Sequence, residues 1–394
     1  MSEQEKGKRT ETERESGGSA KGRRALVLIL ALAVALCAAA FGAYRSYGGM
    51  DGIRRLLSYN KVSAEEDGRA ELFRFDSDRS SQFAMVGENL LIVSTTRVLL
   101  LGGNGEELYS QTVSLTHPAV TAGGQIAAAY DIGGSTLYIM GRKGLERDMS
   151  GETGNGILSV SINSSGYLAL TTATSGYRSA VTVYDQAGEP VFTFNSSERY
   201  VSDACVLDDC KHVAAVTLGE SEGTFASHLM FYALDGEHPE NTVTLDGSLV
   251  LTMGNIGSSA AAVEDDHLTT FSADGALTGS YRYEYPYLRG QSRGGPDFAA
   301  LLLSRYRSGS AFRLVTVGAD GEPIGTADER REVVDISAAG RYIAVLYSDS
   351  LTVYTSDLTV YAELSSTDFA RQAVMREDGT VLLIGASRAW LYIP

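Results

Sequence analysis

The chain has few of the residues that build metal sites and disulfides. It contains three cysteines and five histidines among 394 residues. No two histidines stand at the spacing of a metal motif and there is no second cysteine pair, so the sequence predicts no metal site. Cys205 and Cys210 flank a short turn. Their spacing leaves two alternatives open: a small disulfide in an oxidising compartment, or two thiols within one hairpin.

The motifs of known catalytic sites are also missing. The sequence has no Gly-x-Ser-x-Gly nucleophile motif. Residues 151–156 superficially resemble a phosphate-binding loop, but no Lys-Ser or Lys-Thr pair follows them, so we interpret them as a loop between strands. Asp76 and Asp78 lack the further oxygen ligands of a calcium loop. The sequence therefore predicts no catalytic residue and no cofactor.

Positive charge is scarce over most of the chain. The formal net charge is −16, although residues 1–24 carry seven Lys and Arg against five Glu. Since residues 25–44 are uncharged, the remainder of the chain carries about −18. An acidic domain repels nucleic acid phosphates, so nucleic acid is not an expected partner.

Only one long hydrophobic run occurs, at residues 25–44. Twenty helical residues at about 1.5 Å each span about 30 Å, which is the thickness of a bilayer's hydrocarbon core. Lys21, Arg23 and Arg24 precede the run, and basic residues mark the cytoplasmic side. The sequence thus predicts a single-pass cell-membrane anchor with a cytoplasmic N-terminus and an extracytoplasmic remainder. A cleaved signal peptide is the alternative, but the run continues beyond the candidate cleavage site at residues 38–40.

Polar segments lie on both sides of this run. Residues 1–24 contain almost nothing apolar, which predicts a disordered cytoplasmic tail. Within residues 45–69, Met50, Ile53 and Leu57 stand at helical spacing. This spacing predicts either a juxtamembrane helix on the membrane surface or the end of the membrane helix, followed by a polar linker.

Proline is scarce, with 7 residues, whereas glycine is plentiful, with 43. This composition suits short strands joined by tight turns. From about residue 83, pairs of short apolar strands recur every 35–48 residues, a period typical of the four-stranded blades of a β-propeller. The predicted second and third strands are 89–94 with 97–101, 125–130 with 136–140, 167–172 with 181–184, 212–218 with 228–232, 259–263 with 268–271, 298–303 with 312–317, 342–347 with 351–354, and 380–384 with 389–393. These eight pairs predict an all-β, eight-bladed propeller over residues 70–394, with seven blades as the alternative.

The same turn chemistry recurs after the third strand of several blades. It appears at residues 104–106, 188–189, 235–237, 274–275 and 320–322, each of which contains Gly followed or preceded by Asn, Asp or Glu. Asn-Gly and Asp-Gly pairs tolerate the positive φ angles that tight hairpins require. The recurrence at equivalent places supports the division into blades.

The last predicted blade is one strand short. The chain stops at Pro394, just after a third strand, whereas residues 71–75 alternate like a strand with no blade of its own. We expect this early strand to complete the last blade, because closure of the ring removes an exposed sheet edge. The sequence does not decide whether Leu72 or Phe73 faces inward.

One stretch combines aromatic and basic residues in this otherwise acidic domain. Tyr281, Tyr283, Tyr285 and Tyr287 alternate, and Arg289 and Arg293 follow, with Arg282, Arg305 and Arg307 nearby. Aromatic faces and guanidinium groups suit the recognition of sugars, peptides or anionic polymers. A period-2 aromatic stripe is also what a packed strand face looks like, and Pro286 interrupts this one. Both interpretations remain open.

The layout of the whole chain resembles a known group of proteins. A basic tail, one anchor, the segment 53–57 and blades with Gly-Tyr-Leu-Ala at residue 166 and Val-Thr-Val-Tyr-Asp at residue 181 resemble an uncharacterised bacterial family of membrane-anchored β-propeller proteins. That family is a domain of unknown function with a WD40-like or quinoprotein-like (PQQ-like) propeller. The resemblance implies a propeller and an anchor but no substrate. Trp390 is the only tryptophan, so the repeated Trp motif of quinone-dependent propellers is missing.

Two classes of function fit these features. The favoured hypothesis is a membrane-anchored binding, scaffold or sensing module for a protein or cell-envelope partner, because propellers present loops on two rigid faces. The alternative is a lyase or hydrolase with its site in the central channel. An enzyme of that kind requires polar side chains with shifted pKa values that converge from several innermost strands.

Overall fold

The computed structural model describes residues 51, 52, 55, 59 and 68–394, except 79, 104, 155, 222, 295, 296 and 310. The chain divides into two compact units, Met1–Lys61 and Val62–Pro394. The predicted tail and anchor, and most of the juxtamembrane segment, lie outside the described residues. Within the part that is described, no helix has the length and apolar character needed to cross a membrane.

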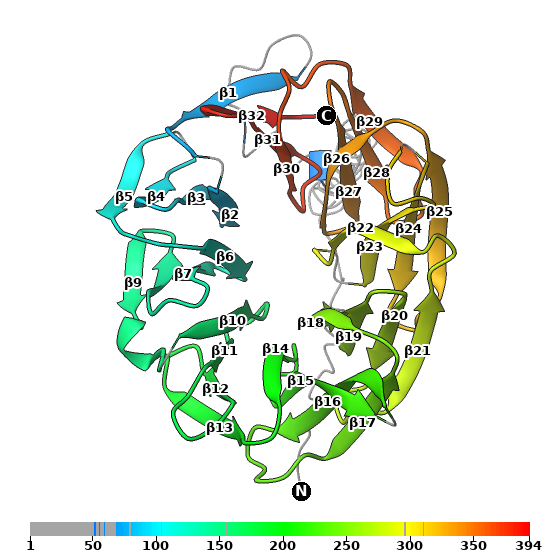
Figure 1. Cartoon of the computed structure of the whole chain (residues 1–394). Helices are drawn as coiled ribbons and strands as arrows, with labels where there is room; N and C mark the ends of the chain where they lie inside the picture. The colour runs from blue at the N-terminus through cyan, green and yellow to red at the C-terminus, as the bar shows by residue number, and fades with distance from the viewer. Residues whose placement is uncertain are drawn as a thin grey trace, which may run out of the picture. The chain divides into compact units, whose positions relative to one another are not determined.

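Eight four-stranded antiparallel sheets follow one another round a ring (Figure 1). Blade 1 contains β2 (Gln82–Val86), β3 (Asn89–Val93), β4 (Arg97–Leu101) and β5 (Glu107–Thr112), and blade 2 contains β6 (Pro118–Gly123), β7 (Ile126–Asp131), β8 (Leu137–Gly141) and β9 (Gly144–Asp148). Blade 3 contains β10 (Ile157–Ile162), β11 (Leu168–Thr172), β12 (Ser179–Tyr184) and β13 (Pro190–Ser196), and blade 4 contains β14 (Tyr200–Val206), β15 (His212–Ser221), β16 (Thr224–Ala233) and β17 (Asn241–Asp246). A turn of 3-10 helix, η1 (Ser150–Glu152), lies between blades 2 and 3.

Blades 5 to 7 continue the same order from the innermost strand outward, and blade 8 closes the ring. Blade 5 contains β18 (Val250–Ile256), β19 (Ser259–Glu264), β20 (His267–Phe271) and β21 (Leu277–Arg282), and blade 6 contains β22 (Tyr287–Ser292), β23 (Phe298–Ser304), β24 (Phe312–Gly318) and β25 (Pro323–Glu329). Blade 7 contains β26 (Val333–Ala339), β27 (Tyr342–Tyr347), β28 (Leu351–Thr355) and β29 (Val360–Leu364). Blade 8 contains β30 (Gln372–Met375), β31 (Val381–Ile384), β32 (Arg388–Tyr392) and, outermost, β1 (Arg69–Arg74). All eight predicted strand pairs are confirmed, and the seven-bladed alternative is wrong.

The hydrophobic core consists of clusters between adjacent blades. The second strands carry it: every residue of β3, β11 and β31 is buried, because each face of these strands packs against a neighbouring blade. One cluster joins Leu302 and Phe312 of blade 6 to Ile336 of blade 7. The apolar middle strands therefore form the walls between blades, as their sequences predict.

The predicted closure of the ring is confirmed. Strand β1 pairs with β32 in antiparallel register, and a bulge between Glu71 and Phe73 resets the alternation. Phe73 is fully buried among residues of blades 8 and 1, whereas Leu72 is only partly buried. The bulge decides which of the two side chains faces inward, because one extra residue moves the following side chain to the other face.

The recurrent glycine turns have the predicted backbone conformation in four of the five places. Gly105 and Gly321, for example, have φ angles of +82° and +76°. A Cβ atom at Gly105 would also lie 2.5 Å from the carbonyl oxygen of Leu72 in the neighbouring blade. The prediction is wrong for Gly236, whose φ is not positive and which lies in a longer connection between β16 and β17.

Cys205 and Cys210 are both free thiols in this structure. Cys205 points from β14 into the cluster between blades 4 and 5, and burial raises the pKa of its thiol to about 12. Cys210 lies on the turn after β14 with a φ of +55°, where Asn163 Nδ2 of the preceding blade lies 3.4 Å from its sulfur. Cys205 therefore packs toward blade 5, whereas Cys210 lies beside blade 3.

Candidate functional site

The strand order gives the propeller two distinct faces. In each antiparallel blade, the connection from the outermost strand to the next innermost strand opens on the same side as the turn between the second and third strands. We call this side the crossover face and the opposite side the turn face. Residues 305–309 and 330–332 both lie on the crossover face, in the connections from β23 to β24 and from β25 to β26.

A cavity of about 650 Å³ opens between blades 6 and 7 on the crossover face. This volume lies within the range of about 300–1,000 Å³ that is typical of ligand pockets. Its lining comes from β22, β23, β24, β26 and the two connections just named. Gly290 helps to open it: Leu288 and Gly290 flank a bulge in β22, and Gly290 has no side chain to occupy the space next to Ile336.

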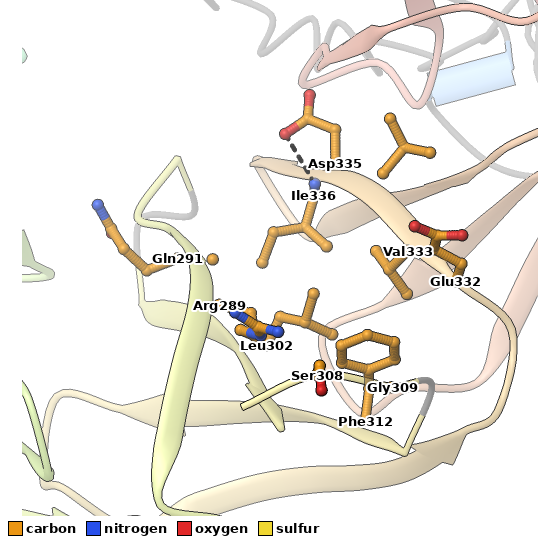
Figure 2. Close-up of a pocket in the computed structure, with 12 residues that line it drawn as sticks. Arg289, Gln291, Leu302, Ser308, Gly309, Phe312, Glu332, Val333, Asp335 and Ile336 are labelled. Carbon is orange, nitrogen blue, oxygen red and sulfur yellow. Dashed lines mark hydrogen bonds between the residues drawn. The ribbon is translucent and has the colours of Figure 1, made fainter. Parts of the chain in front are cut away.

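The floor of this cavity is apolar. Leu302, Phe312 and Ile336 converge on it from β23, β24 and β26, with Val333 beside them (Figure 2). Leu302, Phe312 and Ile336 are themselves members of the core cluster between blades 6 and 7. The cavity is therefore a place where the wall between two blades stays open at one end.

The rim of the cavity is basic and aromatic. The exposed Arg289 lines the cavity, and its Nη2 donates to the backbone carbonyl of Arg307 at 2.6 Å. The guanidinium of Arg307 lies 5.9 Å from the ring centre of Tyr287, and that of Arg305 lies 5.8 Å from the ring centre of Tyr306. Arg305 and Arg307 do not line the cavity themselves but belong to the connection whose Ser308 and Gly309 do, and we call Arg289, Arg305 and Arg307 together the arginine rim. None of the three has a carboxylate partner among the residues that the structure describes.

The structure separates the four alternating tyrosines. Tyr281 and Tyr283 are buried in the core cluster between blades 5 and 6, and Tyr285 packs against that cluster. Tyr287 begins the innermost strand β22, so Pro286 marks the passage from one blade to the next. Arg313, not among the predicted site residues, lies over Tyr285 at 4.6 Å. Of the predicted binding residues, only Arg289 lines the cavity, and Tyr287 begins the same strand two residues earlier.

Arg293 lies at the other end of β22 and serves a different set of contacts. Its Nη2 donates to Thr252 Oγ1 in β18 at 3.2 Å, and Thr252 Oγ1 in turn donates to Asp203 in β14 at 3.2 Å. Gly254 leaves room for the guanidinium, because a Cβ atom there would overlap it. Burial lowers the pKa of Arg293. This chain of contacts links the innermost strands of blades 4, 5 and 6.

Two carboxylates of the innermost strands hold neighbouring blades together. Asp335 accepts hydrogen bonds from the backbone N–H of Ile336 and from that of Ala373 in blade 8, both at 2.9 Å. Asp203 accepts from the N–H of Ala204 at 3.0 Å and from that of Met253 in blade 5 at 2.9 Å. Each aspartate follows a bulge in its strand. Each of these two carboxylates thus accepts a hydrogen bond from the next blade.

Burial raises the pKa of Asp335 to about 6, and the two backbone N–H donors only partly offset this effect. Since the folded pKa lies above the unfolded value of 3.8, folding is favoured by protonation. The stabilisation is therefore complete below pH 3.8 and is lost as pH rises through about 6. The shift corresponds to about 2 to 3 kcal/mol at about 1.4 kcal/mol per pKa unit.

We expect an Asp335→Asn variant to remove this pH dependence. Between pH 4.5 and pH 7, the unfolding free energy of the wild type should fall relative to that of the variant by about 1 to 2 kcal/mol, because only the wild type must ionise a buried carboxyl. Urea unfolding of both proteins at the two pH values measures the difference. Between pH 7 and pH 8 the difference should stay constant, and an unchanged difference across the lower interval would contradict the shifted pKa.

One further cluster has the residue types of a metal site. Glu264, Asp266 and His267 lie at the turn between β19 and β20, and their candidate ligand atoms are within 4.8 Å of one another. Each of the three side chains already has a partner. Glu264 accepts hydrogen bonds from the hydroxyl groups of Ser248 and Thr269, and Asp266 Oδ1 lies 2.7 Å from His267 Nδ1. Burial raises the pKa of Glu264, which disfavours the ionised form that a metal ion requires.

The fold and the cavity define an eight-bladed β-propeller with an open, arginine-rimmed site between two blades. The chain belongs to a family of unknown function, DUF5711, whose family model matches residues 60–366. No curated protein matches the chain. The comparisons therefore give the family and leave the function to the structure.

Solved structures share the architecture at low sequence identity. The C-terminal WD40 domain of Sif2 is 13% identical, with a TM-score of 0.58, and the match covers 83% of this chain and 98% of that one. BamB from Moraxella catarrhalis is 13% identical, with a TM-score of 0.52 and coverage of 82% and 98%. The computationally designed Ika8 protein is 8% identical, with a TM-score of 0.55 and coverage of 82% and 99%. At such identities the likeness concerns the fold alone.

Proposed function

We propose that this protein is a binding scaffold that presents its crossover face to a protein partner. The observation that carries the proposal is the cavity between blades 6 and 7 together with its arginine rim. A concave, partly apolar site with a few oriented polar groups is the usual form of a binding site. The carboxylates of the innermost strands support the same choice over an enzyme, because Asp203 and Asp335 serve as links between blades.

The distribution of exposed apolar side chains also favours the crossover face. Among the residues that the structure describes, twelve large hydrophobic side chains are exposed, and eight of them lie there: Ile132, Tyr177, Tyr200, Phe225, Leu251, Tyr306, Val334 and Phe369. The other four lie near the starts of outermost strands, toward the turn face. Phe369 is 77% exposed and has a φ of +57°, a conformation that bulky residues rarely adopt. Exposed apolar side chains concentrated on one face support a protein-interaction surface.

The proposal includes a membrane tether. Residues 25–44 have the length and composition of a single-pass anchor, and Lys21, Arg23 and Arg24 precede them. An anchored chain of this kind displays the propeller outside the cytoplasm, at the cell envelope. Tethering raises the effective concentration of the propeller toward partners at the same membrane.

Site-specific photocrosslinking tests the scaffold function. With the photoreactive residue p-benzoylphenylalanine in place of Tyr306 or Phe369, we expect irradiation of intact cells to give one discrete adduct with the same partner. The same replacement at Leu277 or Val360 provides the control, because these exposed residues lie near the turn face. Mass spectrometry of the adduct identifies the partner. Adducts from the control positions alone, or no adduct from Tyr306 and Phe369, would contradict the proposal.

A further inference from the structure

We infer that the cavity between blades 6 and 7 binds a linear segment of the partner protein in which one large apolar residue is flanked by acidic residues. This inference rests on the proposed scaffold function and specifies the ligand class of the same cavity. The apolar side chain enters the cavity, and the acidic side chains lie on the arginine rim.

The floor of the cavity determines the apolar part of the ligand. Leu302, Phe312, Val333 and Ile336 offer it only hydrocarbon surface (Figure 2). An apolar side chain buries this surface from water, and the backbone polar groups of a peptide can meet the polar side chains of Gln291, Ser308 and Asp335, which line the same cavity. The site therefore favours a protein segment over an anionic polysaccharide or phosphate polymer. The missing side chain at Gly290 leaves the space that the ligand's side chain would fill.

The rim determines the charge of the ligand. Two neighbouring arginines are already paired: Arg313 with Glu284 and Asp328, and Arg331 with Glu329. The arginine rim is held instead by a backbone carbonyl and by aromatic rings, which leaves guanidinium N–H groups available for carboxylates. In a chain of net charge −16, a local basic site also orients an acidic segment, because the rest of the surface repels it.

Two acidic residues line the same cavity. Asp335 directs its oxygens to the backbone N–H groups of Ile336 and Ala373, and Figure 2 shows the first of these bonds. Glu332 is exposed at the edge of the cavity and has no ion pair among the described residues. It opposes an acidic ligand, so its neutralisation should tighten binding. A neutral substitution of Glu332 should therefore raise the affinity for the ligand, whereas substitution of the arginines should lower it.

Selection from a library of random twelve-residue peptides tests the inference with the full-length protein in detergent micelles. We expect the selected peptides to share a large apolar residue flanked by Asp or Glu. A synthetic selected peptide should then bind at least tenfold more weakly to an Arg289→Gln/Arg307→Gln double variant, and severalfold more tightly to Glu332→Gln. Arg142→Gln is the matched control, because Arg142 and its ion-pair partner Glu88 lie in turns on the opposite face, the turn face. This substitution should leave the affinity for the peptide unchanged.

The two halves of the site are separable by salt. Gly290→Val should weaken binding at every salt concentration, because its side chain occupies the floor, whereas the double arginine variant should lose most of the salt dependence. Circular dichroism and thermal melting confirm that each variant is folded. Basic or neutral consensus peptides, no enrichment, or unchanged affinity in the arginine and Gly290 variants would overturn the inference, as would arginine-dependent binding to anionic vesicles without peptide binding. Crosslinking from Tyr306 and Phe369 would still support the scaffold in those cases.

Discussion

A chain that begins at residue 78 is expected to lose its soluble, heat-resistant propeller. This truncation removes β1, which supplies the outermost strand of blade 8. It exposes the edge of β32, whose unpaired N–H and C=O groups form a template for aggregation. It also removes Phe73, which is fully buried between blades 8 and 1.

The expected destabilisation is large relative to the stability of a domain. Truncation of one buried Phe alone costs about 3–5 kcal/mol, against a total of about 5–15 kcal/mol for a typical protein. The ladder of β1 with β32 and the burial of Phe75 are lost in addition. We therefore expect aggregation of the expressed fragment, or a melting temperature lower by at least ten degrees.

A chain that begins at residue 68 is the matched control. It keeps all of β1 and the carbonyl of Gly68, which accepts a hydrogen bond from the N–H of Ile393 at 2.9 Å. Size-exclusion chromatography and thermal melting compare the two fragments. If both were equally soluble and equally resistant to heat, closure by β1 would contribute little to stability.

Trypsin added to intact cells is expected to release the propeller and to spare the N-terminal tail. Residues 45–69 contain cleavage sites at Arg54, Arg55 and Lys61, between the predicted anchor and the first strand. If the N-terminus is cytoplasmic, an epitope tag on residues 1–24 stays protected on a short membrane-bound fragment. Immunoblots of the membrane and supernatant fractions follow the two products.

Deletion of residues 25–44 gives the complementary control. The anchor supplies the membrane attachment in the proposal, so we expect the deletion to move the chain entirely from the membrane fraction to the soluble fraction. Survival of the propeller in intact cells with digestion only after lysis would reverse the orientation. Retention of the deleted chain in the membrane would require another attachment.

The amino-acid sequence determined the blades and favoured eight of them over seven. The middle strands are short runs of apolar residues, and burial on both faces makes this pattern local and easy to recognise, as in β3 and β31. The closing strand β1 was also predictable, because one strand was missing at the end of the chain and one was left over at the beginning. Length and composition likewise predict the anchor at residues 25–44, which stays a prediction.

Only the tertiary structure decided which side chains share a site. Tyr281 and Tyr287 stand six residues apart, yet the first is in the core between blades 5 and 6 and the second begins the strand beside the cavity. A period-2 stripe fits either a buried or an exposed face, so the sequence left this open. The sequence also left open whether Phe73 or Leu72 is buried, because the extra residue of the bulge reverses the alternation of side chains along β1.

Contacts between blades are the reason for this division. Asp335 meets Ala373 across 38 positions of sequence, and Asp203 meets Met253 across 50. The cavity between blades 6 and 7 likewise combines residues from 289 to 336. Periodicity within a strand reports only which residues are buried, whereas the packing of one blade on the next decides what they touch. The fold is therefore encoded in short repeating patterns, and the site exists only where two of these repeats fail to close completely.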